Sequence, residues 1–152
     1  MKIGSALPNL KLPATGEKSL NFRDFKGKNL IVYFYPKDNT PGCTTEGKDF
    51  TRLYADFQKA DAEIVGISKD SVKKHENFCE KYGFPFDLLA DEEEKACTTF
   101  DVIKEKSMYG KKYMGIERST FLFGKDGKLK HEWRKVSVKG HAEEVLAAVQ
   151  AL

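Results

Sequence analysis

The stretch NLIVYFY, residues 29–35, is a near-continuous run of β-branched and aromatic side chains that Pro36 ends. A run of this kind, without polar alternation, is typical of a strand that is buried on both faces of a sheet. From about Pro41 to Phe57 the pattern changes, and apolar side chains recur at helical spacing. The sequence therefore predicts a buried strand, a turn and a helix, which together open an α/β unit.

Strands and helices are expected to alternate on both sides of this unit. Residues 1–28 are broken by Pro and Gly and predict a strand or hairpin, then a helical turn at residues 22–25. The later elements expected are strands at 62–68 and 86–90, helices at 71–82, 91–100 and 141–152, and a hairpin of strands 116–123 and 129–134. This order fits a thioredoxin-like α/β fold, with a central mixed, mostly parallel sheet flanked by helices and an N-terminal extension. Periodicity alone leaves other α/β topologies open.

Composition narrows the classes of protein to consider. The chain has 152 residues, the length of one domain, and its 11 Phe, 6 Tyr and 1 Trp can form a core. The net charge of +3 gives little reason to expect nucleic acid as a partner. No apolar run reaches the roughly 18 residues of a membrane helix, and residues 1–8 lack the apolar core of a signal peptide. We therefore expect one cytoplasmic domain over residues 1–152, without a nucleic-acid or membrane partner.

The three cysteines are Cys43, Cys79 and Cys97, too few for a disulfide-stapled scaffold. Cys43 falls in the first turn of the helix after the central strand, with Thr40 as the expected N-cap and Pro41 as the first helical residue. The positive end of a helix favours a thiolate. Ionisation alone raises the reactive fraction of a thiol only about thirty-fold, whereas enzymes gain about a million-fold or more. Other groups must therefore orient the electrophile and stabilise charge.

The residues around Cys43 resemble a known family. Pro36-x-x-x-Thr40-x-x-Cys43 matches the signature of peroxiredoxins, and the longer string YPKDNTPGCTTE, residues 35–46, is similar to their bacterioferritin-comigratory, or PrxQ, branch. A second match is ERSTF, residues 117–121, where the family carries its active-site arginine. The resemblance covers almost the whole chain. It implies a thioredoxin-like fold and a thiol-dependent peroxidase that uses no cofactor and no metal.

The resemblance also implies a role for each matched residue. The Cys43 thiolate would attack the terminal oxygen of hydrogen peroxide or an organic hydroperoxide and become a sulfenic acid. The Thr40 hydroxyl and the Cys43 N–H would hold the peroxide oxygens, and Arg118 would keep the sulfur ionised and polarise the O–O bond. Pro36 would shield the site from water. These roles require a Cys43 sulfur that is reachable from solvent and close to the Arg118 guanidinium.

A second thiol must then resolve the sulfenic acid. Many members of this branch carry it five residues after the first cysteine, where this chain has Lys48. Another subset carries it in a later helix, where Cys79 lies, so the resemblance implies that Cys79 forms an intramolecular disulfide with Cys43 that thioredoxin reduces. Two helical positions need local unwinding to come within disulfide range. Cys97 matches no motif and is interpreted as packing. The resemblance further implies a monomer.

Several alternatives stay open at this stage. The string GCTTEGKD, residues 42–49, nearly fits a phosphate-binding P-loop, but Asp49 stands where a hydroxyl is needed. The same Asp49 replaces the arginine of a tyrosine-phosphatase loop. His75 and Cys79 are i, i+4 neighbours without a second pair to complete a metal site. A one-cysteine peroxidase resolved by an external thiol and a non-enzymatic chaperone or interaction module also remain.

Overall fold

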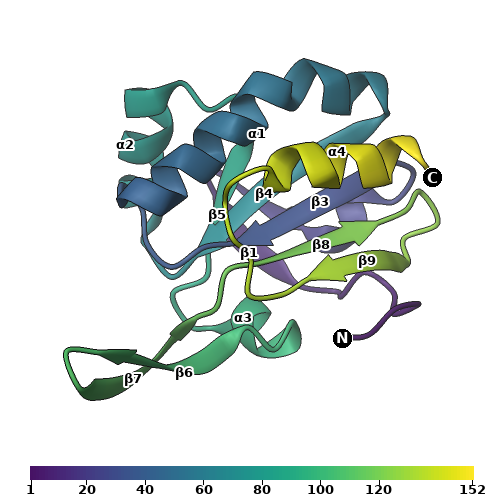
Figure 1. Ribbon diagram of the computed structural model, residues 1–152. Helices are drawn as coiled ribbons and strands as arrows, with labels where there is room; N and C mark the ends of the chain where they lie inside the picture. The colour runs from purple at the N-terminus through teal and green to yellow at the C-terminus, as the bar shows by residue number, and fades with distance from the viewer.

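The computed structural model describes residues 1–152 and contains a seven-stranded sheet in the order β2-β1-β5-β4-β3-β8-β9 (Figure 1). Its strands are β1 (Lys11–Ala14), β2 (Lys18–Asn21), β3 (Asn29–Phe34), β4 (Ala62–Ser68), β5 (Asp87–Ala90), β8 (Ser119–Phe123) and β9 (Leu129–Trp133). A second, two-stranded sheet consists of β6 (Ile103–Met108) and β7 (Lys111–Ile116). The helices are the 3-10 turn η1 (Phe22–Phe25), α1 (Pro41–Lys59), α2 (Val72–Tyr82), α3 (Lys95–Thr99) and α4 (His141–Gln150).

Strand β3 lies inside the sheet because its side chains are apolar on both faces. All six of its residues are buried. It pairs in parallel with β4 and antiparallel with β8. Helices α1, α2 and α4 cover one face of the sheet, and α3 lies on the other (Figure 1). The buried strand expected from the sequence is thus present, and α1 leaves its carboxyl end as predicted.

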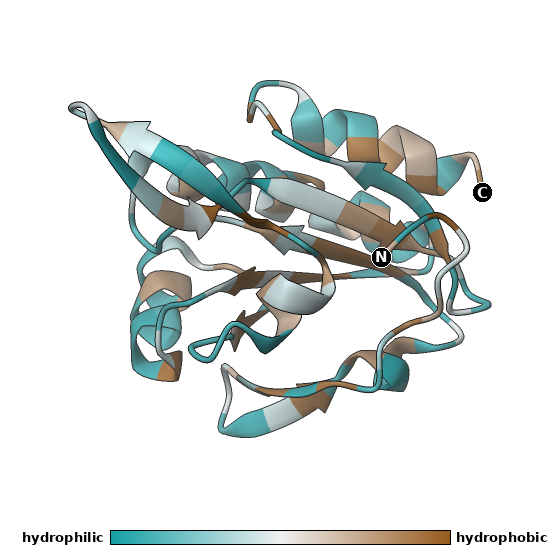
Figure 2. Ribbon diagram, turned by 90° about the horizontal axis from the view of Figure 1, so that it is seen from below, coloured by the Kyte–Doolittle hydropathy of each residue, from teal (hydrophilic) through white to brown (hydrophobic).

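The sheet separates two apolar clusters. Alternate side chains of a strand point to opposite faces, so the neighbours Tyr33 and Phe34 belong to different clusters. Tyr33 shares its cluster with Cys43 and residues of α1, α2 and α4, whereas Phe34 shares the other with Cys97 and residues of α3. Figure 2 shows the apolar segments concentrated on the central strands. Cys43 and Cys97 therefore lie on opposite sides of the sheet.

The sheet is mixed, as predicted, but the prediction that it is mostly parallel is wrong. Only β3–β4 and β4–β5 pair in parallel. The other pairings, β1–β2, β1–β5, β3–β8 and β8–β9, are antiparallel. The difference arises because the N-terminal hairpin joins the sheet beside β5. That partner is distant in sequence, and no local pattern identifies it.

The β6–β7 hairpin is missing from the sequence prediction, and it extends away from the seven-stranded sheet (Figure 1). Its strands are largely exposed, including the apolar side chains of Met108 and Met114, so the alternation of buried apolar and exposed polar residues that marks a half-buried strand is absent. The single strand predicted at residues 116–123 is consequently wrong, because β7 ends at Ile116 and β8 begins at Ser119. Arg118 lies in the short link between them.

No helix is both long and apolar enough to cross a membrane.

The helix predicted at residues 91–100 is shorter than expected and covers only Lys95–Thr99. The reason is the side chain of Asp91, whose two carboxylate oxygens accept the N–H groups of Ala96 at 3.1 Å and Cys97 at 2.8 Å. The residues after Asp91 therefore form a turn that brings its carboxylate to the open N–H groups of the helix.

Candidate active site

Cys43 is the third residue of α1, and local sequence sets where this helix begins. Thr40 has the extended backbone of an N-cap residue, and Pro41 takes the first helical position, where its missing N–H costs nothing. The Thr44 N–H donates to the Thr40 carbonyl at 2.9 Å. The Cys43 N–H therefore belongs to the open first turn, where backbone N–H groups lack helical partners.

The Thr40 side chain does not cap the helix, contrary to expectation. Its hydroxyl instead donates to the carbonyl of Lys37 at 2.8 Å. The N-cap prediction is thus confirmed for the backbone and wrong for the side chain. Because the Lys37 carbonyl takes the proton, the hydroxyl oxygen keeps its lone pairs and can accept a hydrogen bond from a peroxide O–H.

Arg118 reaches from the β7–β8 link to the start of α1. Its Nη2 donates toward the Cys43 Sγ at 3.5 Å, and its Nη1 donates to the Glu46 Oε1 at 2.7 Å. The side chain is only 15% exposed. Burial disfavours the cation, but the charges of Glu46 and Cys43 outweigh it and raise the pKa of Arg118. The structure therefore brings together the cysteine and the arginine that the sequence singled out.

Glu46 is a site residue to which sequence reasoning assigned no role. Its carboxylate is almost fully buried, and its Oε2 has no hydrogen-bond partner. This burial raises the pKa of Glu46 to about 7, although Arg118 opposes the shift. The available signal was spacing, because residues three apart lie on one face of a helix and Glu46 follows Cys43 by three. Glu46 orients Arg118 through the Nη1 hydrogen bond.

The Cys43 sulfur is less open than expected. The residue is 2% exposed and packs in the cluster beneath α1, α2 and α4. The expectation that the sulfur is reachable from solvent is therefore wrong for this conformation. The cause is the position of the first turn of α1, which lies against the apolar face of the sheet while Arg118 contacts the sulfur.

Cys79 lies on the same side of the sheet as Cys43. It is half-buried in α2 and packs against the cluster that contains Cys43. Burial, followed by the charge of Asp38, raises the pKa of Cys79 to about 12, so it is a thiol at neutral pH. Burial, and after it the charge of Glu46, raises the pKa of Tyr33 in the same cluster.

Cys97 is fully buried in the cluster on the other face of the sheet. Burial and the neighbouring Asp91 raise its pKa. The structure thus keeps Cys97 apart from Cys43, in agreement with its interpretation as a packing residue.

Two further residues, Pro36 and Lys106, concern the surroundings of Cys43. Pro36 lies two residues after the end of β3 and is exposed. Lys106, on the unpredicted hairpin, is partly buried, and its pKa is lowered first by this burial and then by the charge of Arg118. The hairpin therefore contributes a second cation to the surroundings of Cys43, and only the tertiary arrangement reveals it.

Two alternatives from the sequence lose their structural basis. A P-loop needs a turn of open backbone, but residues 42–49 lie within α1. A metal site at His75 needs a free ring nitrogen, but Nδ1 contacts Asp38 at 2.6 Å and Nε2 contacts the Leu89 carbonyl at 2.9 Å. His75 is a satisfied core histidine.

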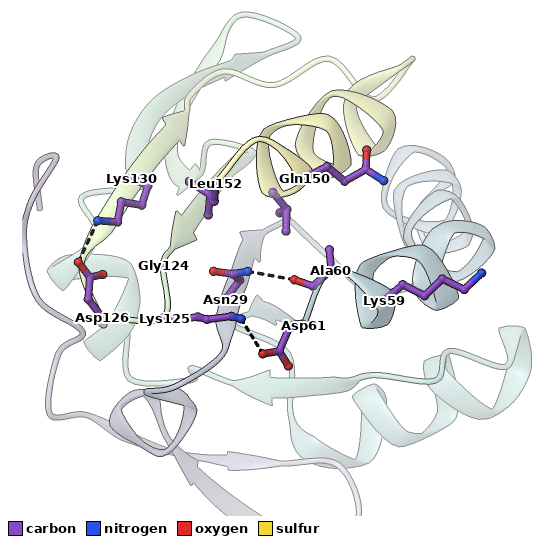
Figure 3. Close-up of a pocket in the computed structure, with 11 residues that line it drawn as sticks. Asn29, Lys59, Ala60, Asp61, Gly124, Lys125, Asp126, Lys130, Gln150 and Leu152 are labelled. Atoms are coloured by element: carbon purple, nitrogen blue, oxygen red, sulfur yellow. Dashed lines mark hydrogen bonds and ion pairs between the residues drawn. The ribbon is translucent and has the colours of Figure 1, made fainter.

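A large pocket of about 630 Å³ lies at the other end of β3, where Asn29 begins the strand (Figure 3). Two lysines in it are paired with carboxylates, Lys125 with Asp61 at 3.0 Å and Lys130 with Asp126 at 2.9 Å. Cys43 follows the opposite end of this strand, so the pocket is separate from the cysteine site.

Comparison with known proteins agrees with this geometry. A model of the AhpC/TSA family matches residues 3–132. The chain belongs to the AhpC/TSA family. Peroxiredoxin Bcp of Xanthomonas campestris is 53% identical over 151 residues, covering 99% of this chain and 94% of the relative. Peroxiredoxin Bcp of Bacillus subtilis is 49% identical over 150 residues, covering 99% and 96%. The predicted resemblance to peroxiredoxins is confirmed, and with it a thiol-dependent peroxidase that reduces peroxides.

Solved peroxiredoxin structures share the fold. Peroxiredoxin Q of Xanthomonas campestris superimposes with a TM-score of 0.92 at 53% identity, covering 99% of this chain and 96% of that one. Trapped intermediate and ligand complexes of the bacterioferritin comigratory protein of that organism concern its alkyl peroxide reduction activity, with a TM-score of 0.92, 52% identity and the same coverage. Two more structures are serine variants at two cysteines, which are as many residues apart as Cys43 and Cys79 are here. The thioredoxin-like fold is confirmed.

Proposed function

We propose that this peroxiredoxin reduces hydrogen peroxide and organic hydroperoxides at Cys43. The observation that carries the proposal is the approach of the Arg118 guanidinium to the Cys43 sulfur, at 3.5 Å. A fixed cation in a buried site stabilises both a thiolate and the charge that develops on a peroxide during attack. The trapped complexes of the Xanthomonas campestris protein support alkyl peroxides as substrates.

The first step oxidises the sulfur and reduces the peroxide. The Cys43 thiolate attacks the terminal oxygen of ROOH, an S–O bond forms while the O–O bond breaks, and ROH leaves after taking up a proton. The Cys43 N–H donates to a peroxide oxygen, and the Thr40 hydroxyl oxygen accepts from the peroxide O–H. Arg118 stabilises the negative charge, and Pro36 limits the access of water. The small exposed fraction of Cys43 implies a small movement that admits the substrate.

Cys79 then resolves the sulfenic acid. Its sulfur attacks the Cys43 sulfur, a disulfide forms and water leaves. Three observations support Cys79 over Cys97: it lies on the same face of the sheet as Cys43, it is only half-buried, and its separation along the chain equals that of the cysteines replaced in the Xanthomonas campestris variants. The raised pKa of Cys79 means that this thiol gains reactivity only after α2 unwinds locally.

The remaining parts of the proposal concern the setting of the reaction. The chain has only three cysteines, too few for a disulfide-stapled scaffold, which supports action in a reducing compartment such as the cytoplasm. The disulfide is reduced by a dithiol protein, for which thioredoxin is our proposal. An intramolecular disulfide needs no second subunit, which supports a monomer. Clusters on both faces of one sheet support a single domain over residues 1–152.

Disulfide mapping by mass spectrometry after one equivalent of peroxide tests the resolving step. We expect a Cys43–Cys79 disulfide in the wild type, and loss of thioredoxin-dependent NADPH oxidation in Cys79→Ser. A stable Cys43 sulfenic acid without any disulfide would instead establish a one-cysteine peroxidase resolved by an external thiol. A Cys43–Cys97 disulfide would contradict the role of Cys79.

A further inference from the structure

A buried polar cluster that the peroxidase chemistry does not use joins the elements of the two cysteines. His75 is 0% exposed and lies one helical turn before Cys79 on α2. Its Nδ1 is 2.6 Å from the Oδ2 of Asp38, in the loop that leads to Cys43. Tyr35, also buried, donates its hydroxyl to the other oxygen of Asp38 at 2.6 Å. Buried charged groups are retained only when they are paired in this way.

The hydrogen-bond partners fix the number of protons in the cluster. The Leu89 carbonyl only accepts, so the Nε2 of His75 must carry a hydrogen. Nδ1 and the carboxylate oxygen then need one shared proton between them, because two lone pairs at 2.6 Å would repel. In the form with this proton on Nδ1, the contact is a charge-assisted hydrogen bond, which is about twice as strong as a neutral one.

A second contact holds the same loop to α2 on the other side of Cys79. The Tyr82 hydroxyl donates to the Oδ1 of Asn39 at 3.0 Å, at an exposed position. His75 and Tyr82 lie four residues before and three residues after Cys79, so the two contacts share its side of the helix. The buried contact is the stronger one because water does not compete for it.

We propose that the Asp38–His75 hydrogen bond is a positioning contact that keeps the Cys79 helix folded, and that its opening limits the rate of disulfide formation. His75 and Asp38 are positioning residues and do not touch the peroxide. This inference rests on the proposed resolving role of Cys79. While the contact is closed, a second peroxide can oxidise the sulfenic acid to a sulfinic acid, with release of another ROH. Opening the contact favours attack by Cys79 and the release of water.

Two substitutions of His75 separate this contact from simple loss of the ring. In His75→Asn the amide nitrogen can occupy the position of Nδ1 and keep the bond to Asp38. In His75→Gln it can occupy the position of Nε2 and keep only the bond to Leu89. Both variants remove the imidazole, so the difference between them reports the bond to Asp38. Tyr82→Phe removes only the exposed hydrogen bond of Tyr82 to Asn39, which Lys81 also contacts at 3.4 Å, and serves as the surface control.

Quenched-flow mass spectrometry after a peroxide pulse gives the rate of Cys43–Cys79 disulfide formation. In His75→Gln we expect this rate to rise about ten-fold or more, as loss of a hydrogen bond to a charged group allows. The amides of α2 should exchange hydrogen faster by a similar factor, and less sulfinic acid should form at high peroxide. His75→Asn and Tyr82→Phe should stay within about two- to three-fold of the wild type. Equal rates in His75→Gln and His75→Asn would overturn the proposal.

A further variant covers the case in which neither substitution of His75 folds. Asp38→Asn can donate its amide to the Nδ1 of a neutral imidazole and accept from Tyr35, so it replaces the charged bond with a neutral one. Relative to the wild type, Asp38→Asn should accelerate disulfide formation and hydrogen exchange at the α2 amides, but by a smaller factor than His75→Gln. Rates equal to those of the wild type would overturn the proposal. If the wild type forms no Cys43–Cys79 disulfide, the resolving role of Cys79 fails, while hydrogen exchange still tests the contact itself.

Discussion

Cys43 and Cys97 occupy the same local position on opposite faces of the sheet. Each is the third residue of a helix, α1 or α3, and each is at most 2% exposed. Their neighbours differ. The Arg118 Nη2 donates toward the Cys43 sulfur at 3.5 Å, whereas the carboxylate of Asp91 accepts the Cys97 N–H at 2.8 Å. The open N–H groups of α3 are thus already used by a protein anion.

This difference shows that two cysteines at helix N-termini can have opposite electrostatic surroundings. At Cys97, burial and the charge of Asp91 both raise the pKa, which favours the inert thiol. At Cys43 the nearest charged group is a guanidinium from a distant part of the chain. We therefore expect the reactivity of each cysteine to depend on the charged group that the tertiary structure places at the start of its helix.

The largest effect expected separates the two cysteines directly. Cys43→Ser should abolish peroxide consumption, because a serine hydroxyl cannot replace the thiolate as nucleophile. Cys97→Ser should retain near-normal turnover per folded molecule, although a buried hydroxyl without a partner lowers stability by about 1–3 kcal/mol. Peroxide-dependent NADPH oxidation with thioredoxin and its reductase measures both. Turnover retained by Cys43→Ser would contradict the assignment of the site.

The second prediction removes the charge that distinguishes the two sites. Arg118→Leu should lower the second-order rate constant with peroxide by about 100- to 1,000-fold, as loss of one stabilising donor typically does. Arg134 provides the matched control on the Cys97 side, since it donates to the carbonyls of Asp101 at 2.7 Å and Phe100 at 2.9 Å. Arg134→Leu should reduce stability and leave the rate constant unchanged. Stopped-flow measurement with excess peroxide distinguishes the two, and an equal loss in both variants would remove the special role of Arg118.

The contrast between the two cysteines also shows what the sequence could reveal. The apolar run that forms β3 and the N-cap and proline before α1 are local features, so the strand, the helix and the position of Cys43 in its first turn were predicted correctly. The role of Cys43 stays a prediction. Arg118 was identified only through family resemblance, because nothing local to residues 117–121 shows that its side chain reaches α1. The antiparallel pairing of the N-terminal hairpin beside β5 was missed for the same reason: its partner is distant in sequence.

Burial and polar networks were the least predictable features. Glu46 was visible as part of a motif, but its burial and raised pKa depend on how α1 packs and on Arg118. The β6–β7 hairpin gave no signal because it buries few apolar side chains, yet it places Lys106 near Arg118. Residues that act through distant partners leave no periodicity in the sequence.

The third prediction concerns Glu46, the carboxylate beside Cys43, and the dependence of protein stability on pH. The pKa of Glu46 is about 7 in the folded protein against 4.5 for a free side chain. The unfolded chain thus loses this proton near pH 4.5 and the folded chain near pH 7. Between these values the folded state binds more protons, so this group makes the free energy of unfolding fall as pH rises, by about 3 kcal/mol in total.

Urea unfolding at pH 5 and pH 8 measures this fall. Glu46→Gln should remove most of it, because glutamine does not titrate in this range. Glu93→Gln is the matched control, since the Glu93 side chain is 80% exposed, and it should keep the pH dependence of the wild type. The same pH dependence in Glu46→Gln as in the wild type would show that Glu46 is not the group responsible.

The smallest effect concerns the residue before each cysteine, which is Gly42 in α1 and Ala96 in α3. A Cβ added to Gly42 would stand 3.1 Å from the Arg118 Nη2, so Gly42→Ala should displace the guanidinium by a few tenths of an ångström. A misplacement of about 1 Å can cost about 100-fold in rate, and we therefore expect a loss of about three- to ten-fold here. The same change should not lower stability, because Ala is favoured over Gly in a helix by about 1 kcal/mol. Ala96→Gly should do the reverse, with lower stability and an unchanged rate. The rate constant with peroxide and the melting temperature of each variant test these expectations. A rate constant of Gly42→Ala equal to that of the wild type would mean that the guanidinium tolerates displacement, so that its charge matters more than its exact position.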